Sequence, residues 1–274
     1  MSIRRAIVSA LVLATCLAGL AATAGVVVEQ EQREPGTSAV LGRTVFYLDA
    51  GRLRIETQTP EGDNLLVIFR SDKPVAWTID LAEGTYFELT PAKITKMREQ
   101  MDRMQREMAE ALKQMPPEQR RAAERMMEQM GQAAGPPQPT TVRILARDEK
   151  VDPFVCIRYE VLRGGTREEE VWTAPLDQLQ LRPEEYQTLV ALVRLFDPLG
   201  PQAPTSRLSG LAPSESGGEK IEGFPVRALS YDNGQVIAEE RVVRAERQSF
   251  DATLFELPPG LHPTEMEEEE DVEP

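Results

Sequence analysis

Short runs in which apolar and polar residues alternate constrain the fold more than any other feature of the sequence. Before residue 90, short runs with strand character occupy residues 26–29, 44–48, 52–57, 65–69, 75–79 and 85–88, and several of them alternate in this way. A period of two is typical of strands with one buried face, and turn residues such as Asp49-Ala50-Gly51 separate the runs. We therefore expect an antiparallel meander in which Leu53 and Ile55 face one side of the sheet and Arg54 the other.

Residues 91–131 are predicted to form a helical insert, because the apolar period changes from two to about three and a half at Pro91. Thr90 is a suitable N-cap, and Pro116-Pro117 would end the first helix. A second helix is expected over residues 117–130, followed by a connector rich in Gly and Pro. One side of the first helix is formed by Ile94, Met97, Met101, Met104, Met108, Leu112 and Met115.

This methionine-rich side has three possible roles. Because methionine is flexible and polarisable, the side could pack as core or lid, present an adaptable surface to apolar ligands, or bind copper(I). Spacing by three and four is typical of any core-facing helix, and copper sites usually combine Met with His or Cys, which are nearly absent here. We predict no metal site and no cofactor. The candidate ligand-facing residues are Met97, Met101, Met104, Met108, Leu112 and Met115.

The second half of the chain is predicted to return to strands. These are expected at residues 140–147, 154–162, 167–173, 221–231, 235–245 and 254–255, with a helix at 183–196 and a flexible loop at 197–218. Residues 156–172 and 226–242 share one pattern, a strand, a glycine turn and a second strand rich in glutamate, and Asn233-Gly234 is typical of a type I′ turn. Two similar hairpins favour one continuous curved sheet.

The first 24 residues are typical of a secretory signal peptide. Arg4 and Arg5 precede an uncharged, mainly apolar run that ends in the small-x-small pattern Ala22-Thr23-Ala24. Retention as a membrane anchor and lipid attachment at Cys16 are the alternatives. Cleavage would place the protein in the periplasm with Cys156 as its one cysteine, so that no internal disulfide could form and a buried structural thiol is expected.

The charge balance argues against several partners. The net charge is −14, and removal of the signal peptide takes away two arginines and no acids, which gives −16. Nucleic acids and anionic lipid surfaces both require a basic face, so neither is expected as a direct partner. Residues 261–274 are predicted to form an acidic, disordered tail that includes His262, the one histidine of the chain.

A search for catalytic residues identifies no site. The one histidine, His262, lies near the acidic tail without an evident catalytic partner, so no Ser-His-Asp or Cys-His system is identified, and phosphate-binding or dinucleotide-binding glycine motifs are missing from the sequence. A glycosidase-type carboxylate pair stays open, but the cluster at residues 168–170 is interpreted as a solvated strand face. Trp77 and Trp172 are interpreted as core residues.

Several of these segments together resemble an uncharacterised family of exported bacterial proteins, domain-of-unknown-function family 4412, which is related to the LolA/LolB lipoprotein carriers. The resemblance covers nearly the whole mature chain. The segments that carry it are Gly51-Arg52-Leu53-Arg54-Ile55-Glu56, Thr85-Tyr86-Phe87-Glu88-Leu89, the methionine-rich residues 97–130 with Pro116-Pro117-Glu118-Gln119-Arg120, Glu168-Glu169-Glu170-Val171-Trp172-Thr173-Ala174-Pro175 and Phe255-Glu256-Leu257-Pro258-Pro259-Gly260-Leu261.

The resemblance implies a mainly β (α+β) fold of LolA-like type, a strongly curved antiparallel half-barrel covered by the methionine-rich helices. It would form a single domain over residues 25–260, and the last of these segments looks like the final strand of the carriers. In the carriers the cavity holds lipid chains, so the methionine-rich side would form part of the lid over an apolar ligand. The long methionine-rich helix, the loop at 197–218 and the acidic tail depart from the carriers.

Three functions therefore stay open. The first is a non-enzymatic periplasmic protein that binds an apolar or lipid-like ligand between the curved sheet and the helices. The second is a cell-envelope interaction protein whose core is filled by its own helices and whose methionine side or acidic tail binds a partner protein. The third is a hydrolase that uses a carboxylate pair.

Overall fold

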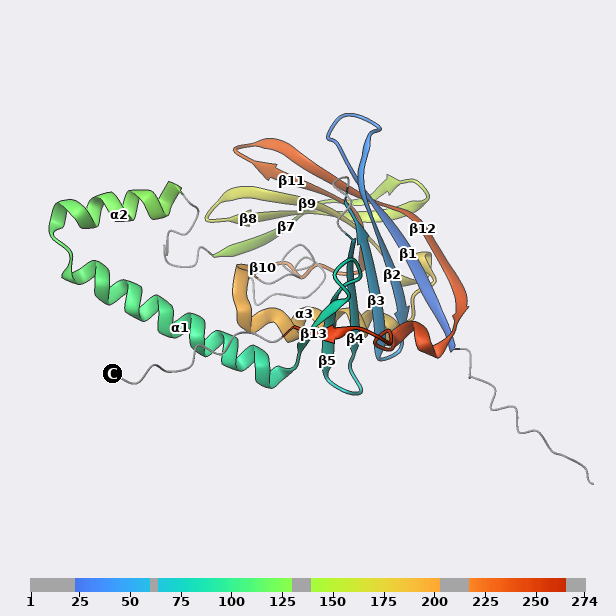
Figure 1. Ribbon diagram of the computed structural model, residues 1–274. Coiled ribbons are helices and arrows are strands. Elements are labelled where there is room, and N and C mark those ends of the chain that lie inside the picture. The colour runs from blue at the N-terminus through green and yellow to red at the C-terminus, as the bar shows by residue number, and fades with distance from the viewer. Residues whose placement is uncertain (1–22, 60–63, 130–138, 203–216, 265–274) are drawn as a thin grey trace, which may run out of the picture.

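The computed structural model describes residues 23–59, 64–129, 139–202 and 217–264. Within these residues, thirteen strands form one sheet in the order β10-β7-β8-β9-β11-β12-β1-β2-β3-β4-β5-β6-β13. Neighbouring strands run antiparallel except at the two ends, where β10 and β13 add short parallel pairings to β7 and β6. The sheet is strongly curved and does not close (Figure 1), which confirms the predicted mainly β half-barrel with helices.

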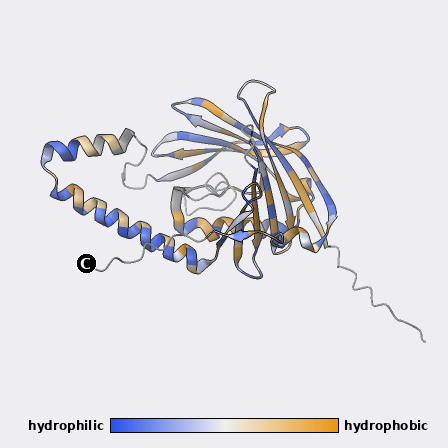
Figure 2. Ribbon diagram, in the orientation of Figure 1, coloured by the Kyte–Doolittle hydropathy of each residue, from blue (hydrophilic) through white to orange (hydrophobic). Residues whose placement is uncertain are grey.

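The meander predicted before residue 90 is present, and β1 and β2 are considerably longer than expected. Its strands alternate in hydropathy (Figure 2), as a sheet with two differently covered faces requires. Leu53 and Ile55 are buried and Arg54 is half-buried on the opposite face, as predicted. The strands are β1 (Thr23–Arg33), β2 (Val40–Asp49), β3 (Arg52–Gln58), β4 (Asn64–Arg70), β5 (Val75–Asp80) and β6 (Thr85–Leu89).

The second half also follows the predicted pattern. The repeated segments form the hairpins β8–β9 and β11–β12, and they lie side by side in the sheet because β9 pairs with β11. Asn233 and Gly234 both have positive φ, 49° and 78°, as a type I′ turn requires. The strands are β7 (Thr140–Val151), β8 (Phe154–Arg163), β9 (Thr166–Ala174), β10 (Gly217–Gly218), β11 (Phe224–Asp232), β12 (Gln235–Phe250) and β13 (His262–Pro263).

Three helices accompany the sheet. The insert forms α1 (Pro91–Gln114) and α2 (Pro117–Gln129), and α3 (Pro183–Phe196) has the predicted bounds. Thr90 caps α1, since its side chain accepts a hydrogen bond from the Lys93 amide at 3.3 Å. The predicted connector lies almost wholly outside the described residues, as does most of the predicted loop, whose first residues form the 3-10 helix η2 (Asp197–Gln202).

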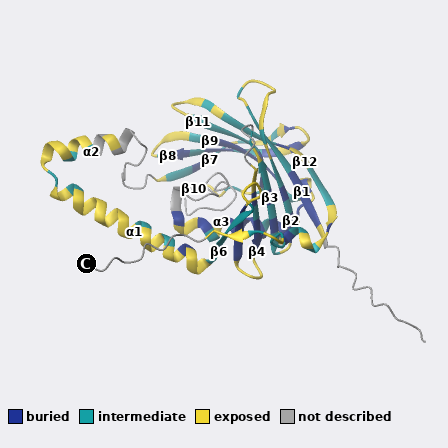
Figure 3. Cartoon of the chain, viewed as in Figure 1, coloured by how far each residue is buried: buried dark blue, intermediate teal, exposed yellow. Residues whose placement is uncertain are grey.

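The main core lies between α3 and the concave side of the sheet. Leu189, Leu192 and Phe196 of α3 are fully or almost fully buried against strand residues such as Val26 and Leu48. Helix α3 is therefore dark in the burial colouring, whereas α1 and α2 are exposed over most of their length (Figure 3). The hollow of the half-barrel is thus filled in part by a helix of the same chain.

The convex side of β1 to β5 is covered by the chain that follows β12. Phe255 packs with Val27 and Phe250, and Leu257 and Leu261 pack on a second buried cluster that includes Trp77. The prediction of a strand at residues 254–255 is wrong, because Ala252–Phe255 form the 3-10 helix η4. The same applies to the final strand implied by the resemblance at residues 255–261.

The predicted start of the disordered tail, at residue 261, is too early in the chain. His262 and Pro263 form β13 and pair with Thr85 and Tyr86 of β6, and the amide of His262 donates to the Gly84 carbonyl at 3.0 Å. His262 is exposed, as expected, but its backbone belongs to the sheet. The acidic residues 265–274 lie outside the described residues.

Most of the predicted signal peptide also lies outside the described residues, but its predicted cleavage point falls inside β1. Thr23 and Ala24 pair with Phe250 and Ser249 of β12. The Ala24 carbonyl accepts hydrogen bonds from the guanidinium groups of Arg182 and Arg247, at 3.1 and 3.3 Å. Cleavage after Ala24 would remove this acceptor and the first two residues of the strand.

Candidate functional site

The surroundings of the methionine-rich side of α1 differ from one end of the helix to the other. At the start, Ile94 is 2% exposed and Met97 and Met101 are half-buried against the main core. Further along, α1 leaves the sheet (Figure 1), and Met104 and Met108 are 64% and 41% exposed. The prediction of a core-facing helix therefore holds only for its first turns, because the sheet ends before the helix does.

The far end of α1 is fixed by α2 rather than by the sheet. The guanidinium group of Arg120 donates to the carbonyls of Leu112 at 2.8 Å, Lys113 at 2.8 Å and Met115 at 3.2 Å, which satisfies acceptors left free at the helix end. Leu112 and Met115 are half-buried at this corner. Among the six candidate residues, two contact the core, two are exposed and two lie at the corner between the helices.

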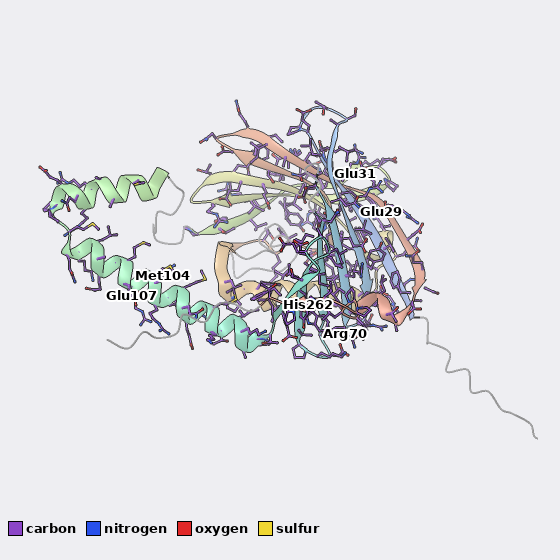
Figure 4. All side chains as sticks on the ribbon, in the orientation of Figure 1. Glu29, Glu31, Arg70, Met104, Glu107 and His262 are labelled. Atoms are coloured by element: carbon purple, nitrogen blue, oxygen red, sulfur yellow. The ribbon has the colours of Figure 1, made fainter. Side chains whose placement is uncertain are left out.

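Figure 4 shows Met104 on the part of α1 that stands away from the sheet. Exposed thioethers that continue a half-buried row are suited to bind an apolar surface, since methionine adapts its shape at little cost. The thioether groups themselves supply neither a general acid nor a general base. We therefore treat Met97, Met101, Met104 and Met108 as the candidate binding surface and call it the methionine face.

A surface pocket of about 480 Å³ lies elsewhere and was not predicted. It contains none of the candidate residues. Its walls come from β1, β8, β12 and the 3-10 helix η1 (Leu176–Leu179), which are distant in sequence, so no local pattern could have indicated it. Its lining includes Arg33, Phe154, Gln178, Arg241 and Arg244.

Two buried carboxylates converge between β8 and β9. Glu160 and Glu170 are opposite each other in the sheet and are 7% and 2% exposed. Arg167 binds both, at 2.7 and 3.0 Å, and Arg158 binds Glu170. The interpretation of residues 168–170 as a solvated face is thus wrong for Glu170, which begins a run of buried residues that continues to Ala174 at the end of β9.

This cluster has the chemistry of a structural ion-pair network. General acid catalysis needs a carboxyl group that carries a proton, whereas here guanidinium groups bind both carboxylates. The same row contains Trp172, whose ring lies between the guanidinium groups of Arg158 and Arg227, each 4.8 Å from the ring centroid. Trp172 and Trp77 are both buried, which confirms their predicted core positions.

Glu169 points to the other face of β9 and has different surroundings. Burial, followed by the nearby charges of Glu240 and Glu168, raises the pKa of Glu169 to about 7, and Arg163 opposes this only partly. A carboxyl whose pKa is raised in the folded protein binds a proton more tightly there than in the unfolded chain. The contribution of Glu169 to the free energy of unfolding is therefore fully present below about pH 4.5. It is lost as the pH rises to about 7.

We expect Glu169→Gln to raise the free energy of unfolding at pH 8 by about 1–3 kcal/mol, because it removes a half-buried charge that lies near Glu240 and Glu168. At pH 5, where Glu169 is largely protonated, the effect should be near zero. Urea unfolding at both pH values measures the difference, with Glu168→Gln as the control on the same strand. Equal effects of the two substitutions at pH 8 would contradict the assignment.

The cysteine, metal-binding groups and membrane-spanning helices considered from the sequence can also be checked. Cys156 is buried, as predicted, and burial raises the pKa of its thiol to about 11. Within the described part of the chain, no three His, Cys, Asp or Glu side chains come together as a metal site. None of the helices in that part combines the length and the apolar character needed to cross a membrane.

Comparisons with known proteins give no family and only distant structural similarity. No family model matches the sequence, and no curated protein matches it. The fold is similar to a chain in the complex structure of Pseudomonas aeruginosa MucA/MucB, with a TM-score of 0.33 and 7% sequence identity. The match covers 82% of this chain and 52% of that chain, so this chain spans about half the length of that one.

Proposed function

We propose that the protein is exported to the periplasm and binds an apolar or lipid-like ligand through the methionine face, without catalysing a reaction. The ligand would lie between the curved sheet and the helices, with α1 as an adaptable cover. This role agrees with the resemblance to domain-of-unknown-function family 4412 and the LolA/LolB carriers, which we retain as a proposal.

The single observation that supports this function is the row of methionine side chains along α1, which continues from the core to the solvent. Met97 and Met101 contact core residues, and Met104 and Met108 continue the same row beyond the edge of the sheet. A ligand that covered the exposed part would extend the existing core rather than create a new one. Burial of each methionine side chain should then contribute about 1–2 kcal/mol to binding.

The double substitution Met104→Gln/Met108→Gln tests the proposal. Glutamine has a similar length and helix propensity, so folding should be unchanged while the binding surface becomes polar. We expect affinity for the fluorescent apolar probe N-phenyl-1-naphthylamine to fall by at least about tenfold, which corresponds to about 1.4 kcal/mol. The control is Met126→Gln on α2, a methionine that is 61% exposed but lies off the methionine face. Equal affinity of all three proteins would reject the proposal.

A second function is favoured by the position of α3. Because α3 fills part of the concave side, the protein could use the methionine face to bind a partner protein in the cell envelope and hold no small ligand. Native mass spectrometry of the exported protein before and after organic extraction separates the two functions. A bound lipid in stoichiometric amount supports the first, and an unchanged apo mass without probe uptake supports the second.

A further inference from the structure

Along the first four turns of α1, one flank carries basic side chains, and this flank begins beside β6. Lys93, Lys96 and Arg103 lie within about 80° of one another around the helix, at about 100° per residue. The Lys93 ammonium lies 3.6 Å from the Glu88 carboxylate on β6, which fixes the direction of this flank. All three side chains are exposed. Met97, the first residue of the methionine face, lies about 40° beyond Lys93.

The chain returns to this place near its end. The Thr264 amide donates to the Tyr86 carbonyl at 2.8 Å, so residue 264 lies against β6. The pairing of β13 with β6 is parallel, and β6 is followed directly by Thr90 and α1. A chain that continues past Thr264 in the same direction therefore runs toward the first turns of α1. Figure 4 shows His262 on the sheet and Met104 and Glu107 on the projecting part of the helix.

Charge and length both fit an interaction between the following residues and this flank. Residues 265–274 carry seven Asp and Glu and no Lys or Arg. Residues 91–129 carry nine Lys and Arg against seven Asp and Glu, in a chain whose net charge is −14. Ten extended residues span up to about 33 Å, whereas Lys93 and Arg103 are about 15 Å apart along the helix axis.

We propose that residues 265–274 dock on the basic flank of α1, with their glutamates beside Lys93, Lys96 and Arg103 and with Met266 against the methionine face. The segment then competes with the apolar ligand for part of its binding surface. This regulatory consequence rests on the proposed function, whereas the docking itself does not. Salt weakens such exposed ion pairs, so ligand affinity rises with ionic strength in the full chain.

The docking is tested directly by treating the full chain with a carbodiimide, which joins a carboxyl group to a neighbouring amine without a spacer. We expect amide links from Lys93 or Lys96 to Glu267–Glu270, identified by peptide mass spectrometry and suppressed by 1 M salt, which reduces the screening length to about 3 Å. Lys113 and Glu110, 2.9 Å apart, provide the internal positive control. Formation of the control link without any link to residues 265–274 would overturn the docking. Links found only in covalent dimers would overturn it too and assign the segment to a second copy.

Removal of residues 265–274 tests the competition. We expect the shortened chain to bind N-phenyl-1-naphthylamine about fivefold more tightly at low salt, a gain of about 1 kcal/mol. Lys96→Glu/Arg103→Glu should have the same effect in the full chain, and Lys113→Glu should have none. Tight probe binding that does not respond to the deletion would reject the competition while leaving the proposed function intact. Cross-links without any probe binding would confirm the docking and reject the proposed function.

Discussion

Replacement of Phe255 by alanine is expected to lower the free energy of unfolding by about 3–5 kcal/mol, the range for deletion of a fully buried aromatic side chain. Phe255 is 0% exposed. Its ring meets Phe250 edge to face, with centroids 5.6 Å apart, and the Arg52 guanidinium lies 5.1 Å from its centroid. These contacts, together with the packing of Phe255 on Val27, attach η4 to β12, β3 and β1, so the substitution should also release the residues that follow.

Urea unfolding at pH 7 measures the loss of stability, and limited proteolysis detects release of residues 251–264. Phe255→Leu is the matched control, since it keeps most of the apolar volume and should cost about 1–1.5 kcal/mol. The ion pairs of Glu256 with Arg70 and Lys73 lie in the same segment and cannot replace the lost packing, because the Glu256 and Lys73 side chains are 46% and 51% exposed and pairs with a solvated partner contribute little. A loss below 1 kcal/mol for the alanine variant, within the range of ordinary surface substitutions, would show that this segment is not part of the core.

The sequence predicts those elements whose pattern is local. The predicted bounds of strand β3 and helix α3 agree with the structure to within one residue, because alternation and helical spacing both report which face is buried. The hairpin turn at Asn233-Gly234 was equally predictable, since few residue pairs accept two positive φ angles. The two similar hairpins favour a continuous curved sheet, whereas the half-barrel shape is implied only by the resemblance.

The segment after β12 shows why other elements could not be predicted. Leu254 and Phe255 form a short apolar run, which has the same pattern in a strand and in a single 3-10 turn. Their burial depends on Val27 and Tyr47, more than 200 residues away in the chain. Only tertiary packing distinguishes the two conformations, and a local pattern contains no information about it.

The candidate site was predicted in composition but not in extent. Periodicity places Met97 and Met108 on the same side of α1 but does not say where the sheet ends, so burial of the first and exposure of the second could not be predicted. The prediction for Glu170 has the same limitation, because a local pattern does not report its burial. Its charge suggests a solvated position, whereas Arg158 on the neighbouring strand β8 and Arg167 on β9 itself neutralise it inside the sheet.

The second large effect is expected at Glu185, whose side chain is 0% exposed at the start of α3. Its carboxylate accepts hydrogen bonds from the Arg182 amide at 2.8 Å, from the Arg182 guanidinium at 2.6 and 3.0 Å, and from both terminal nitrogens of Arg247 at 3.0 Å. Every partner is a donor. In Glu185→Gln the amide NH₂ group must therefore face another N–H group, and we expect a loss of about 3–4 kcal/mol at pH 7.

The pH dependence of this loss distinguishes the ion-pair network from simple packing. Burial alone would raise the pKa of Glu185, but the hydrogen bonds from Arg247 and Arg182 outweigh it and lower the pKa below 4.5. A lowered pKa gives stability that is present above the unfolded value and is lost as the pH falls through the folded value. The difference between the wild-type protein and Glu185→Gln should consequently shrink in urea titrations below pH 4. Glu184→Gln, at the adjacent exposed position, should cost less than about 0.5 kcal/mol at every pH. If the loss in free energy of unfolding caused by Glu185→Gln stayed constant down to pH 3, its cause would be the shape of the side chain rather than its charge.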